Sequence, residues 1–349
     1  MSVIEARFSA REGKLTGAVE MIHGAGGRAT AELIRTLFRR HLDNPLLAQG
    51  NDQAAFPVAA GRMVMTTDAH VIAPLFFPGG DIGSLAVHGT INDVAMAGAR
   101  PLYLSAAFVL EEGFPLADLD RIVASMAQAS GAAGVPIVTG DTKVVEKGKG
   151  DGVFITTTGI GIVPDGVEIS GDRALPGDMV LLSGSIGDHG IAVLSKRENL
   201  TFETEILSDS AALHTLVADM VGAVPGIRVL RDPTRGGLGA TLNEIAQQSG
   251  VGIHLDEAAI PIKPDVSAAC ELLGLDPLYI ANEGKLIAIA PPEKAQLLLA
   301  VMRAHPLARD AAIIGEVKHD PHAFVQMRTR FGGNRMVDWL AGDPLPRIC

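Results

Sequence analysis

The sequence predicts an α+β protein of two domains followed by a short tail. The chain has 349 residues, which exceeds the length of a typical single domain. An apolar content of 47% supplies ample material for packed cores. Helical and strand-like stretches follow one another without the regular alternation of a doubly wound sheet, which favours α+β. We expect domains over 1–165 and 166–335 and a tail over 336–349.

The first half mixes the two kinds of element. Leu33, Ile34, Leu37, Phe38 and Leu42 fall on one face of a helix predicted over 31–42. Apolar spacing predicts further helices over 83–99 and 117–134. Strand-like stretches occupy 61–68, 101–110, 135–141 and 152–163.

A domain boundary is predicted within 163–178, where proline, glycine and turn signals concentrate. A second unit begins with the strand-like stretch over 179–187. Its predicted helices cover 238–250, 266–275 and 293–305, and its buried strands cover 285–290 and 311–317. The residues after 340 contain two prolines, and we expect them to be extended and exposed.

Composition excludes several classes of protein. The formal net charge of −11 argues against nucleic acid or an anionic membrane surface as the partner. No stretch approaches the roughly 20 apolar residues that span a bilayer, and the first residues lack the apolar core of a signal peptide. We therefore expect a cytoplasmic protein. Of the two cysteines, Cys270 is expected in an apolar core, and the terminal Cys349 is expected to be a free thiol.

Acidic residues beside small ones mark the stretches that could carry chemistry. They stand in turns, at predicted strand ends and in one predicted helix: Asp52, Asp68, Asn92 with Asp93, Asp141 with Lys143, and Asp232. Taken singly, each is explained as a cap or turn residue. Together, in an acidic chain, they favour Mg²⁺ that holds the phosphate oxygens of a nucleotide.

Glycine-rich stretches alone identify no nucleotide-binding motif. HGAGG, FPGGDIG and TRGGLG could let backbone N–H groups approach phosphates, but none is a P-loop or a dinucleotide-binding fingerprint. Glu283 and Lys285 lie in NEGK, before a predicted strand, where a carboxylate is ordinarily a solvated charge. The histidines show no metal-ligand spacing and are interpreted as structural.

Six stretches in order over nearly the whole chain carry a resemblance: HGAGG, NDVAMAGA, GDTKVV, DPTRGGL, NEGK and the terminal PRIC. Together they resemble the HypE family, the carbamoyl dehydratases of nickel-iron hydrogenase maturation. GDTKVV with a terminal PRIC is the specific part. The resemblance implies a two-domain PurM-like architecture, similar to aminoimidazole ribonucleotide synthetase and selenophosphate synthetase. It also implies a flexible C-terminal tail and the use of ATP and Mg²⁺.

The resemblance further implies a reaction at the last residue. In the family, the terminal cysteine carries a carbamoyl group, and ATP drives its dehydration to a thiocyanate that supplies cyanide to the iron. Phosphorylation makes the carbamoyl oxygen a good leaving group, and a base must take the N–H protons. By resemblance, Cys349 is the attachment site, Glu283 is the base, and Lys143 orients or deprotonates the carbamoyl group.

The binding residues are implied in the same way. The implied metal ligands are Asp52, Asp68, Asp93, Asp141 and Asp232. The implied nucleotide-binding residues are Asp68, Asn92, Asp93, Gly140, Asp141, Thr142, Thr234 and Gly236. Asp52 departs from the pattern, since related enzymes often have a paired acid where this chain has Asn51 and Asp52. HGAGG, with His23 and Gly24, is expected to close over the site, with no role assigned.

The family also implies partners: a second copy bound through the N-terminal domains, the carbamoyltransferase HypF, and a HypC–HypD complex that receives the cyanide. An extended tail from Met336 to Cys349 could reach on the order of 40 Å. That length allows exchange between a partner's active site and the chain's own ATP cleft. Tethering makes capture of the substrate intramolecular.

Two other functions remain open. One is a synthetase of the same superfamily that acts on a free small molecule; selenophosphate synthesis is disfavoured because no cysteine lies near the N-terminus. The other is a non-catalytic maturation scaffold that uses the tail only for docking. Lys143 and Glu283 favour catalysis, because a docking protein needs neither.

Overall fold

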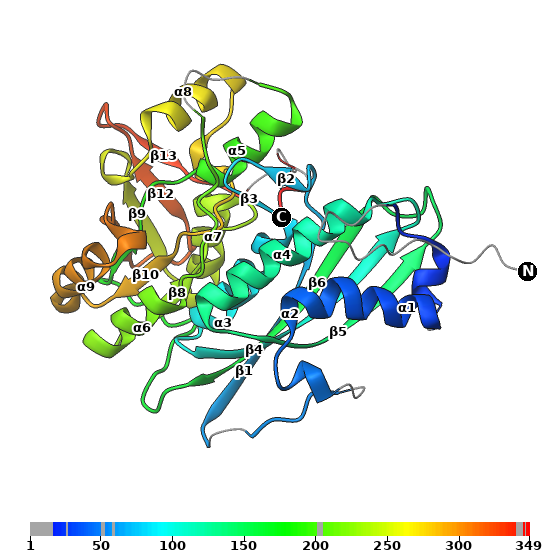
Figure 1. Cartoon of the computed structure of the whole chain (residues 1–349). Coiled ribbons are helices and arrows are strands. Elements are labelled where there is room, and N and C mark those ends of the chain that lie inside the picture. The colour runs from blue at the N-terminus through cyan, green and yellow to red at the C-terminus, as the bar shows by residue number, and fades with distance from the viewer. Residues whose placement is uncertain are drawn as a thin grey trace, which may run out of the picture.

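The computed structural model describes residues 17–25, 27–49, 53–57, 60–200, 205–339, 345 and 347–349. These residues form two large mixed sheets, each packed against helices, with a small two-stranded sheet near the C-terminus (Figure 1). Strands of the first large sheet come from 62–163, and strands of the second come from 179–336. Within this part of the chain, no helix is long and apolar enough to cross a membrane.

The first sheet has the strand order β1-β6-β4-β5, in which only β4 and β5 run parallel. Its strands are β1 (Arg62–His70), β4 (Arg100–Glu111), β5 (Ile137–Val145) and β6 (Val153–Val163). The small sheet pairs β2 (Phe76–Phe77) with β3 (Gly80–Asp81). The helices of this half are α1 (Arg28–Leu33), α2 (Arg39–Leu42), α3 (Ile82–Met96) and α4 (Leu116–Ala133), with the π-helical turn η2 (Ile34–Phe38) between the first two.

Helix α3 is the central element of the first half. Asp81 caps its N-terminus by accepting hydrogen bonds from the backbone of Gly83 and Ser84. Almost every residue of α3 is buried, on all faces, because the helix lies between the first sheet and the second half of the chain. Asn92 and Asp93 therefore occupy interior positions of a helix, as predicted, where ordinary surface solvation does not explain them.

The second sheet has the strand order β13-β12-β9-β11-β7-β10-β8. Its strands are β7 (Met179–Leu182), β8 (Val229–Arg231), β9 (Gly252–Asp256), β10 (Ile287–Ala290), β11 (Ala312–Lys318), β12 (Val325–Arg328) and β13 (Asn334–Met336). Its helices are α5 (Asp188–Arg197), α6 (His214–Ala223), α7 (Gly237–Ser249), α8 (Pro264–Leu273) and α9 (Pro292–Ala304). Separate apolar clusters join the sheet to α7 and to α6 with α9. Short 3₁₀ turns η1 (Met21–Gly24), η3 (Leu47–Gln49), η4 (Glu257–Ala259), η5 (Pro277–Tyr279) and η6 (Pro306–Ala308) complete the described elements.

Each element predicted from the sequence is present, with shifted ends. The helix predicted over 31–42 is divided by η2, and Ile34 is 39% exposed instead of facing the core. The extra backbone spacing of a π-turn rotates the following residues and breaks a regular apolar face. The elements α5, α6, β8, β9, β12 and β13 were not predicted. Four of these are strands of three to five residues, too short to show a clear period.

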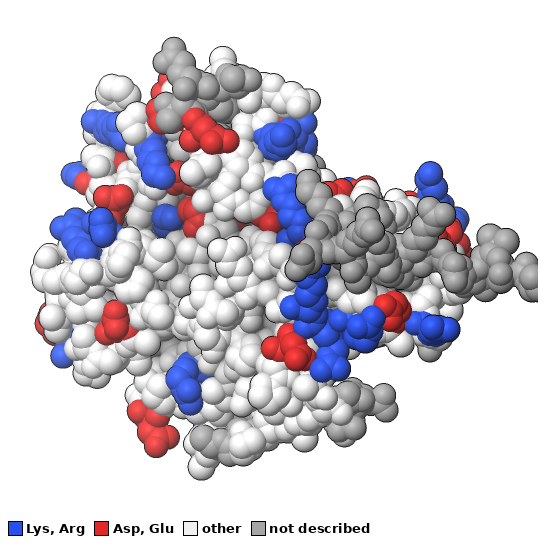
Figure 2. All heavy atoms as spheres, in the orientation of Figure 1, with Lys and Arg blue, Asp and Glu red and all other residues white. Residues whose placement is uncertain are grey.

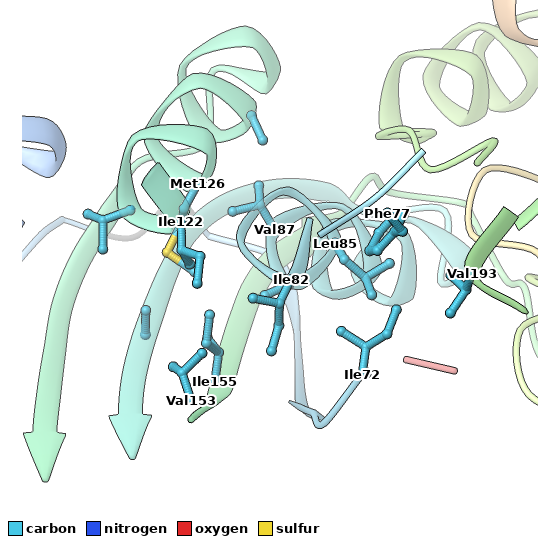
Figure 3. Packing of buried hydrophobic residues seen from close by; sticks show 14 of the residues in the cluster. Ile72, Phe77, Ile82, Leu85, Val87, Ile122, Met126, Val153, Ile155 and Val193 are labelled. Carbon is cyan, nitrogen blue, oxygen red and sulfur yellow. The ribbon is translucent and has the colours of Figure 1, made fainter. Parts of the chain in front are cut away.

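One apolar core runs from the first half into the second. Ile72 and Phe77 point toward Val193 of α5, while Ile122 and Met126 of α4 lie over the first sheet (Figure 3). Cys270 belongs to the same core, as predicted from its apolar helix face. Burial raises the pKa of its thiol to about 11. The two halves are therefore joined by shared packing and not only by the linking segment.

The described end of the tail is docked, contrary to the expected exposure. Leu345 and Ile348 are 5% and 4% exposed and join the shared core. Val71 N donates to Cys349 O at 3.1 Å, and Ala73 N donates to Arg347 O at 3.2 Å. Two apolar side chains gain burial, and backbone groups beyond β1 gain partners. This is why these residues lie against the protein and not in solvent.

A buried ion pair fixes the NEGK segment. Lys285 Nζ lies 2.9 Å from Asp209 Oδ2, and Asp209 also accepts from the backbone N–H groups of Glu283 (3.1 Å) and Gly284 (3.3 Å). A Cβ at Gly284 would lie 1.8 Å from Asp209 O, so this position requires glycine. Burial alone would raise the pKa of Asp209, but Lys285 and His189 hold that pKa below its usual value.

Replacement of Lys285 by methionine leaves the Asp209 carboxylate buried without its cation. We expect Lys285→Met to lower the free energy of unfolding in urea by about 3–5 kcal/mol at neutral pH. The matched control is Lys318→Met, whose ion pair with Glu316 is exposed; it should cost no more than about 1 kcal/mol. Because the Asp209 pKa is lowered on folding, the difference should persist at about pH 3.9 and be lost only as the pH falls further, through the lowered native pKa of Asp209. Equal losses for the two variants would contradict this assignment.

Candidate active site

Two carboxyl groups of the first half meet where β1 passes α3. Asp68 Oδ2 lies 3.3 Å from Nε2 of the buried His70, and Asp93 Oδ2 accepts from Thr66 Oγ1 at 2.9 Å. Gly89 of α3 faces them: a Cβ there would lie 3.2 Å from His70 Nε2 and 3.5 Å from Asp68 Oδ2. Glycine thus lets the helix approach the strand closely enough to gather these groups.

The second half adds two more carboxyl groups at the same place. Asp232 follows β8, and Glu283 lies before β10. Burial and the neighbouring Asp93 raise the pKa of Asp232 to about 7. Burial and the charge of Asp232 raise the pKa of Glu283 well above its usual value, with smaller contributions from Asp209, Asp68 and Asp93. We call Asp68, Asp93, Asp232 and Glu283 the acidic cluster.

Asn92 holds the two sides of the cluster together. Its amide Nδ2 donates to the backbone oxygens of Ala211 (3.0 Å) and Glu283 (3.3 Å), and its Oδ1 accepts from Leu213 N at 2.7 Å. Asn92 was predicted to bind nucleotide, but its described contacts are structural. They connect α3 to the NEGK segment, and so they position Glu283 relative to Asp93.

Basic side chains offset the charge of the acidic cluster only in part: Arg231 lowers the pKa of Asp93 and Asp232, yet both remain raised. Burial and the charge of Asp68 raise the pKa of Asp93 even though Thr66 donates to it. Glu283 is 4% exposed, and among the described residues its Oε1 atom has no hydrogen-bond partner. Such groups are costly unless a ligand neutralises them or their pKa shifts. This arrangement is typical of a functional site. Glu283 is therefore not the solvated surface charge that a carboxylate before a strand ordinarily is.

The cluster fits a cation that is shared with a phosphate. Carboxylate oxygens are the ligands that Mg²⁺ prefers, usually together with substrate phosphates. Within the described ranges, no three His, Cys, Asp or Glu side chains are arranged to hold one metal ion. Asp68, Asp93 and Asp232 would therefore need oxygens from a bound nucleotide to complete the coordination. Asp52, another of the predicted metal ligands, lies outside the described residues.

Asp141 and Lys143 lie apart from the acidic cluster. Asp141 is level with Ala107 on β4, whereas the adjacent Ala106 faces the core. Asp141 thus points to the open face of the first sheet, away from α3. Its strand β5 is the third from β1, which corresponds to about 14 Å at about 4.8 Å per strand. Lys143 Nζ instead pairs with Asp141 at 2.6 Å, and both side chains are exposed.

Gly140 and Thr142 flank Asp141 on β5. A Cβ at Gly140 would lie 2.4 Å from Ala106 O, so close packing of β4 on β5 accounts for this glycine without a nucleotide. Thr142 N donates to Asp141 Oδ1 at 2.8 Å. Of the HGAGG stretch, Gly24 lies against the end of the same strand: a Cβ there would lie 2.8 Å from Val144 N. Val144 is level with the buried Leu110 of β4, on the face opposite to Lys143, so Gly24 packs against β5 and not over the acidic cluster.

Thr234 and Gly236 follow Asp232 and lead into α7. Thr234 O accepts from Gly237 N at 2.9 Å, and Gly236 adopts a left-handed φ of +78° at the N-cap of the helix. The conformation requires glycine. The N-terminus of α7 lies just beyond Asp232 in the chain, which suits binding of an anion near the cluster.

Cys349 lies at the edge of this site. Its carbonyl accepts from Val71, the residue that follows His70, and the His70 ring contacts Asp68 of the cluster. The terminal residue thus docks just past the end of the strand that carries Asp68. Four residues that organise this region were not identified as site residues from the sequence: His70, His189, Arg197 and Asp209. Their signal is tertiary, because each also contacts residues far away in the sequence, His70 through Ile155 and Gly89.

Comparisons with known proteins agree over most of the chain. The models of AIR synthase related protein match at residues 50–163 (N-terminal domain) and 176–328 (C-terminal domain). A carbamoyl dehydratase HypE of Cupriavidus necator is 71% identical over 96% of this chain and 95% of its own length. The crystal structure of a hydrogenase maturation protein HypE in complex with ATP is 52% identical, with a TM-score of 0.92, and covers 95% of this chain and 99% of that chain.

A crystal structure of a HypE–HypF complex contains a chain 49% identical to this one, with a TM-score of 0.78, covering 88% of this chain and 99% of the other. The resemblance seen in the six sequence motifs is confirmed, as is the two-domain PurM-like α+β fold. The chain belongs to the carbamoyl dehydratase HypE family of AIR synthase related proteins.

Proposed function

We propose that this protein uses ATP to dehydrate an S-carbamoyl group on its own Cys349. The product is a thiocyanate that supplies the cyanide ligand of the iron in nickel-iron hydrogenase. The observation that carries the proposal is the docking of Cys349 beside Val71, at the end of the strand that bears Asp68 and His70. A substrate attached to the chain thus docks just beyond the strand that carries Asp68, one carboxyl of the acidic cluster.

The reaction balances with one ATP. The γ-phosphoryl group is transferred to the carbamoyl oxygen, and ADP is released. That oxygen then departs with the phosphate as the C–O bond breaks. Loss of the two N–H protons leaves a carbon–nitrogen triple bond, with the sulfur–carbon bond to Cys349 intact. Phosphate is a far better leaving group than hydroxide, which explains the consumption of ATP.

Glu283 is the proposed base. A base must be ionised to accept a proton, yet burial and the charge of Asp232 raise the Glu283 pKa. A bound divalent cation supplies positive charge that favours the ionised form of carboxyls beside it. We propose that Asp68, Asp93 and Asp232 hold Mg²⁺ with ATP. Positive charge held there would favour the ionised form of Glu283, in which it can accept a proton.

Asp141 and Lys143 act, in this proposal, from a second copy of the chain. In one chain they lie on the open sheet face, about three strands from Asp68. The same face exposes Met63 and Met65, at 55% and 70%, and Val109 beside Lys143. Apolar side chains exposed on an open sheet face favour coverage by another sheet. A homodimer through this face would supply Lys143 to the neighbouring site.

The partners follow from the chemistry of the tail. We propose that HypF carbamoylates Cys349; the support is the HypE–HypF complex of a relative 49% identical to this chain. We also propose that a HypC–HypD complex receives the cyanide and that these steps take place in the cytoplasm. Residues 340–344 and 346 lie outside the described part of the tail. The described end, docked against Val71 and Ala73, must leave the site for either partner to reach Cys349.

Carbamoylated protein mixed with Mg²⁺–ATP should lose the mass of one water at Cys349. Intact-mass spectrometry with and without ATP, followed by peptide mapping, makes this measurement. The control is unmodified protein with ATP, which should not change in mass. Turnover of ATP on the carbamoylated chain without loss of mass would rule out the dehydratase function and favour a synthetase that acts on a free molecule.

If Glu283 is the base, Glu283→Gln should affect nitrile formation but not carbamoylation. Carbamoylation by the partner should persist, because it takes place outside this site. Nitrile formation should fall by about 10²-fold or more, the usual range for loss of a general base. Glu271→Gln, an exposed change on α8, is the matched control and should behave as the parent. An unchanged rate of nitrile formation would remove Glu283 from the base role.

A further inference from the structure

A buried histidine of α5 binds the backbone of the tail. His189 Nε2 lies 2.9 Å from Ile348 O, and Nδ1 lies 2.8 Å from Ser208 Oγ. Since a carbonyl oxygen can only accept, Nε2 carries the proton, and Nδ1 accepts from the Ser208 hydroxyl. Ser208 Oγ in turn accepts from Ser210 N at 3.1 Å. The histidine is completely buried, so its orientation is fixed by these contacts.

An arginine at the end of the same helix binds both the tail and its docking strand. Arg197 Nε donates to Ala73 O and Nη2 donates to Arg347 O, both at 2.8 Å. Arg347 itself donates to Val71 O at 2.9 Å and pairs with Asp151. Cationic side chains gather beside the C-terminus and over α4 and α2 in Figure 2. A charged donor shared by two carbonyls makes a stronger contact than a neutral one.

We propose that His189 and Arg197 are positioning residues that clamp the tail in the site; we call them the α5 clamp. His189 binds the main-chain oxygen of Ile348 and Arg197 binds that of Arg347, and neither hydrogen bond involves the Cys349 side chain. The clamp therefore holds the tail by its backbone, whichever group the sulfur carries. A free thiol, a carbamoyl group and a nitrile can all be presented at one position.

The clamp is continuous with the support of the proposed base. Ser208, the partner of His189, is next to Asp209, which accepts from the backbone of Glu283 and Gly284. The same short segment therefore orients the tail on one side and Glu283 on the other. The catalytic consequence of the clamp rests on the proposed function, whereas docking of the tail does not.

The rate of alkylation of Cys349 by iodoacetamide measures docking without ATP or carbamoyl groups. Cys270 is 1% exposed with a thiol pKa of about 11, so at pH 8 the signal comes from Cys349. We expect Arg197→Gln to raise this rate on the order of tenfold, the effect of losing a charged hydrogen bond. Lys196→Gln, an exposed neighbour with the same loss of charge, is the control and should match the parent. Equal rates for Arg197→Gln and Lys196→Gln would overturn the clamp.

Two variants of His189 test the donor itself. His189→Leu removes the hydrogen bond to Ile348 O and should raise the alkylation rate. His189→Gln keeps an N–H group of similar reach and should restore slower alkylation. Thermal unfolding first establishes that each variant is folded. The same rate for folded leucine and glutamine variants would show that the donor does not hold the tail. If the leucine variant does not fold, the alkylation rates of Arg197→Gln and Lys196→Gln decide whether the clamp holds the tail.

Dehydration in a single turnover separates the clamp from the proposed function. Carbamoylated Arg197→Gln should form nitrile more slowly than carbamoylated Lys196→Gln, by about the factor seen in alkylation. Faster alkylation with an unchanged dehydration rate would overturn the positioning role. If even the parent forms no nitrile, the proposed function fails, and the alkylation rates still decide whether the clamp exists.

Discussion

Mutual repulsion among four carboxyl groups is the constraint on which the rest of the structure depends. Asp68, Asp93, Asp232 and Glu283 come from two different halves of the chain, and burial together with neighbouring carboxylates raises the pKa of Asp93, Asp232 and Glu283. The unfavourable free energy of this crowding must be offset by favourable interactions elsewhere in the protein. The apolar core shared by the two halves and the buried pair of Lys285 with Asp209 supply the compensation. Such a cluster favours a positively charged ligand.

The tail uses the same junction between the halves. Leu345 and Ile348 extend the shared core, while the backbone from Arg347 to Cys349 continues the hydrogen bonding past the end of β1. Docking therefore relies on ordinary burial and backbone pairing, and nothing in it requires a modified sulfur. On the proposed function, these contacts are released when the tail visits a partner. A substrate carried on the chain needs binding that is specific in position and readily reversed.

The sequence predicts the parts of this site better than their arrangement. Acidic residues at strand ends and the motifs NEGK and PRIC point to Asp68, Asp232, Glu283 and Cys349. The separation of Lys143 from Glu283 could not be read from the sequence, because it follows from the strand order and from the face on which Asp141 falls. His189 gave no signal, since its partners are Ser208 and a carbonyl at the end of the chain. Burial of Leu345 and Ile348 was missed because prolines and a chain end indicate exposure.

The central claim is that Cys349 is a substrate of its own chain, and a mixing experiment tests it most directly. Carbamoylated Glu283→Gln protein has a loaded tail but lacks the base, and Cys349→Ala protein has the base but no substrate. Nitrile formation is followed by mass spectrometry after the two are combined with Mg²⁺–ATP. Because the tail docks on Val71, Ala73 and His189 of the same chain, the mixture should form nitrile no faster than carbamoylated Glu283→Gln alone. Nitrile formation at the parent rate would show that the tail serves another chain and would contradict the account.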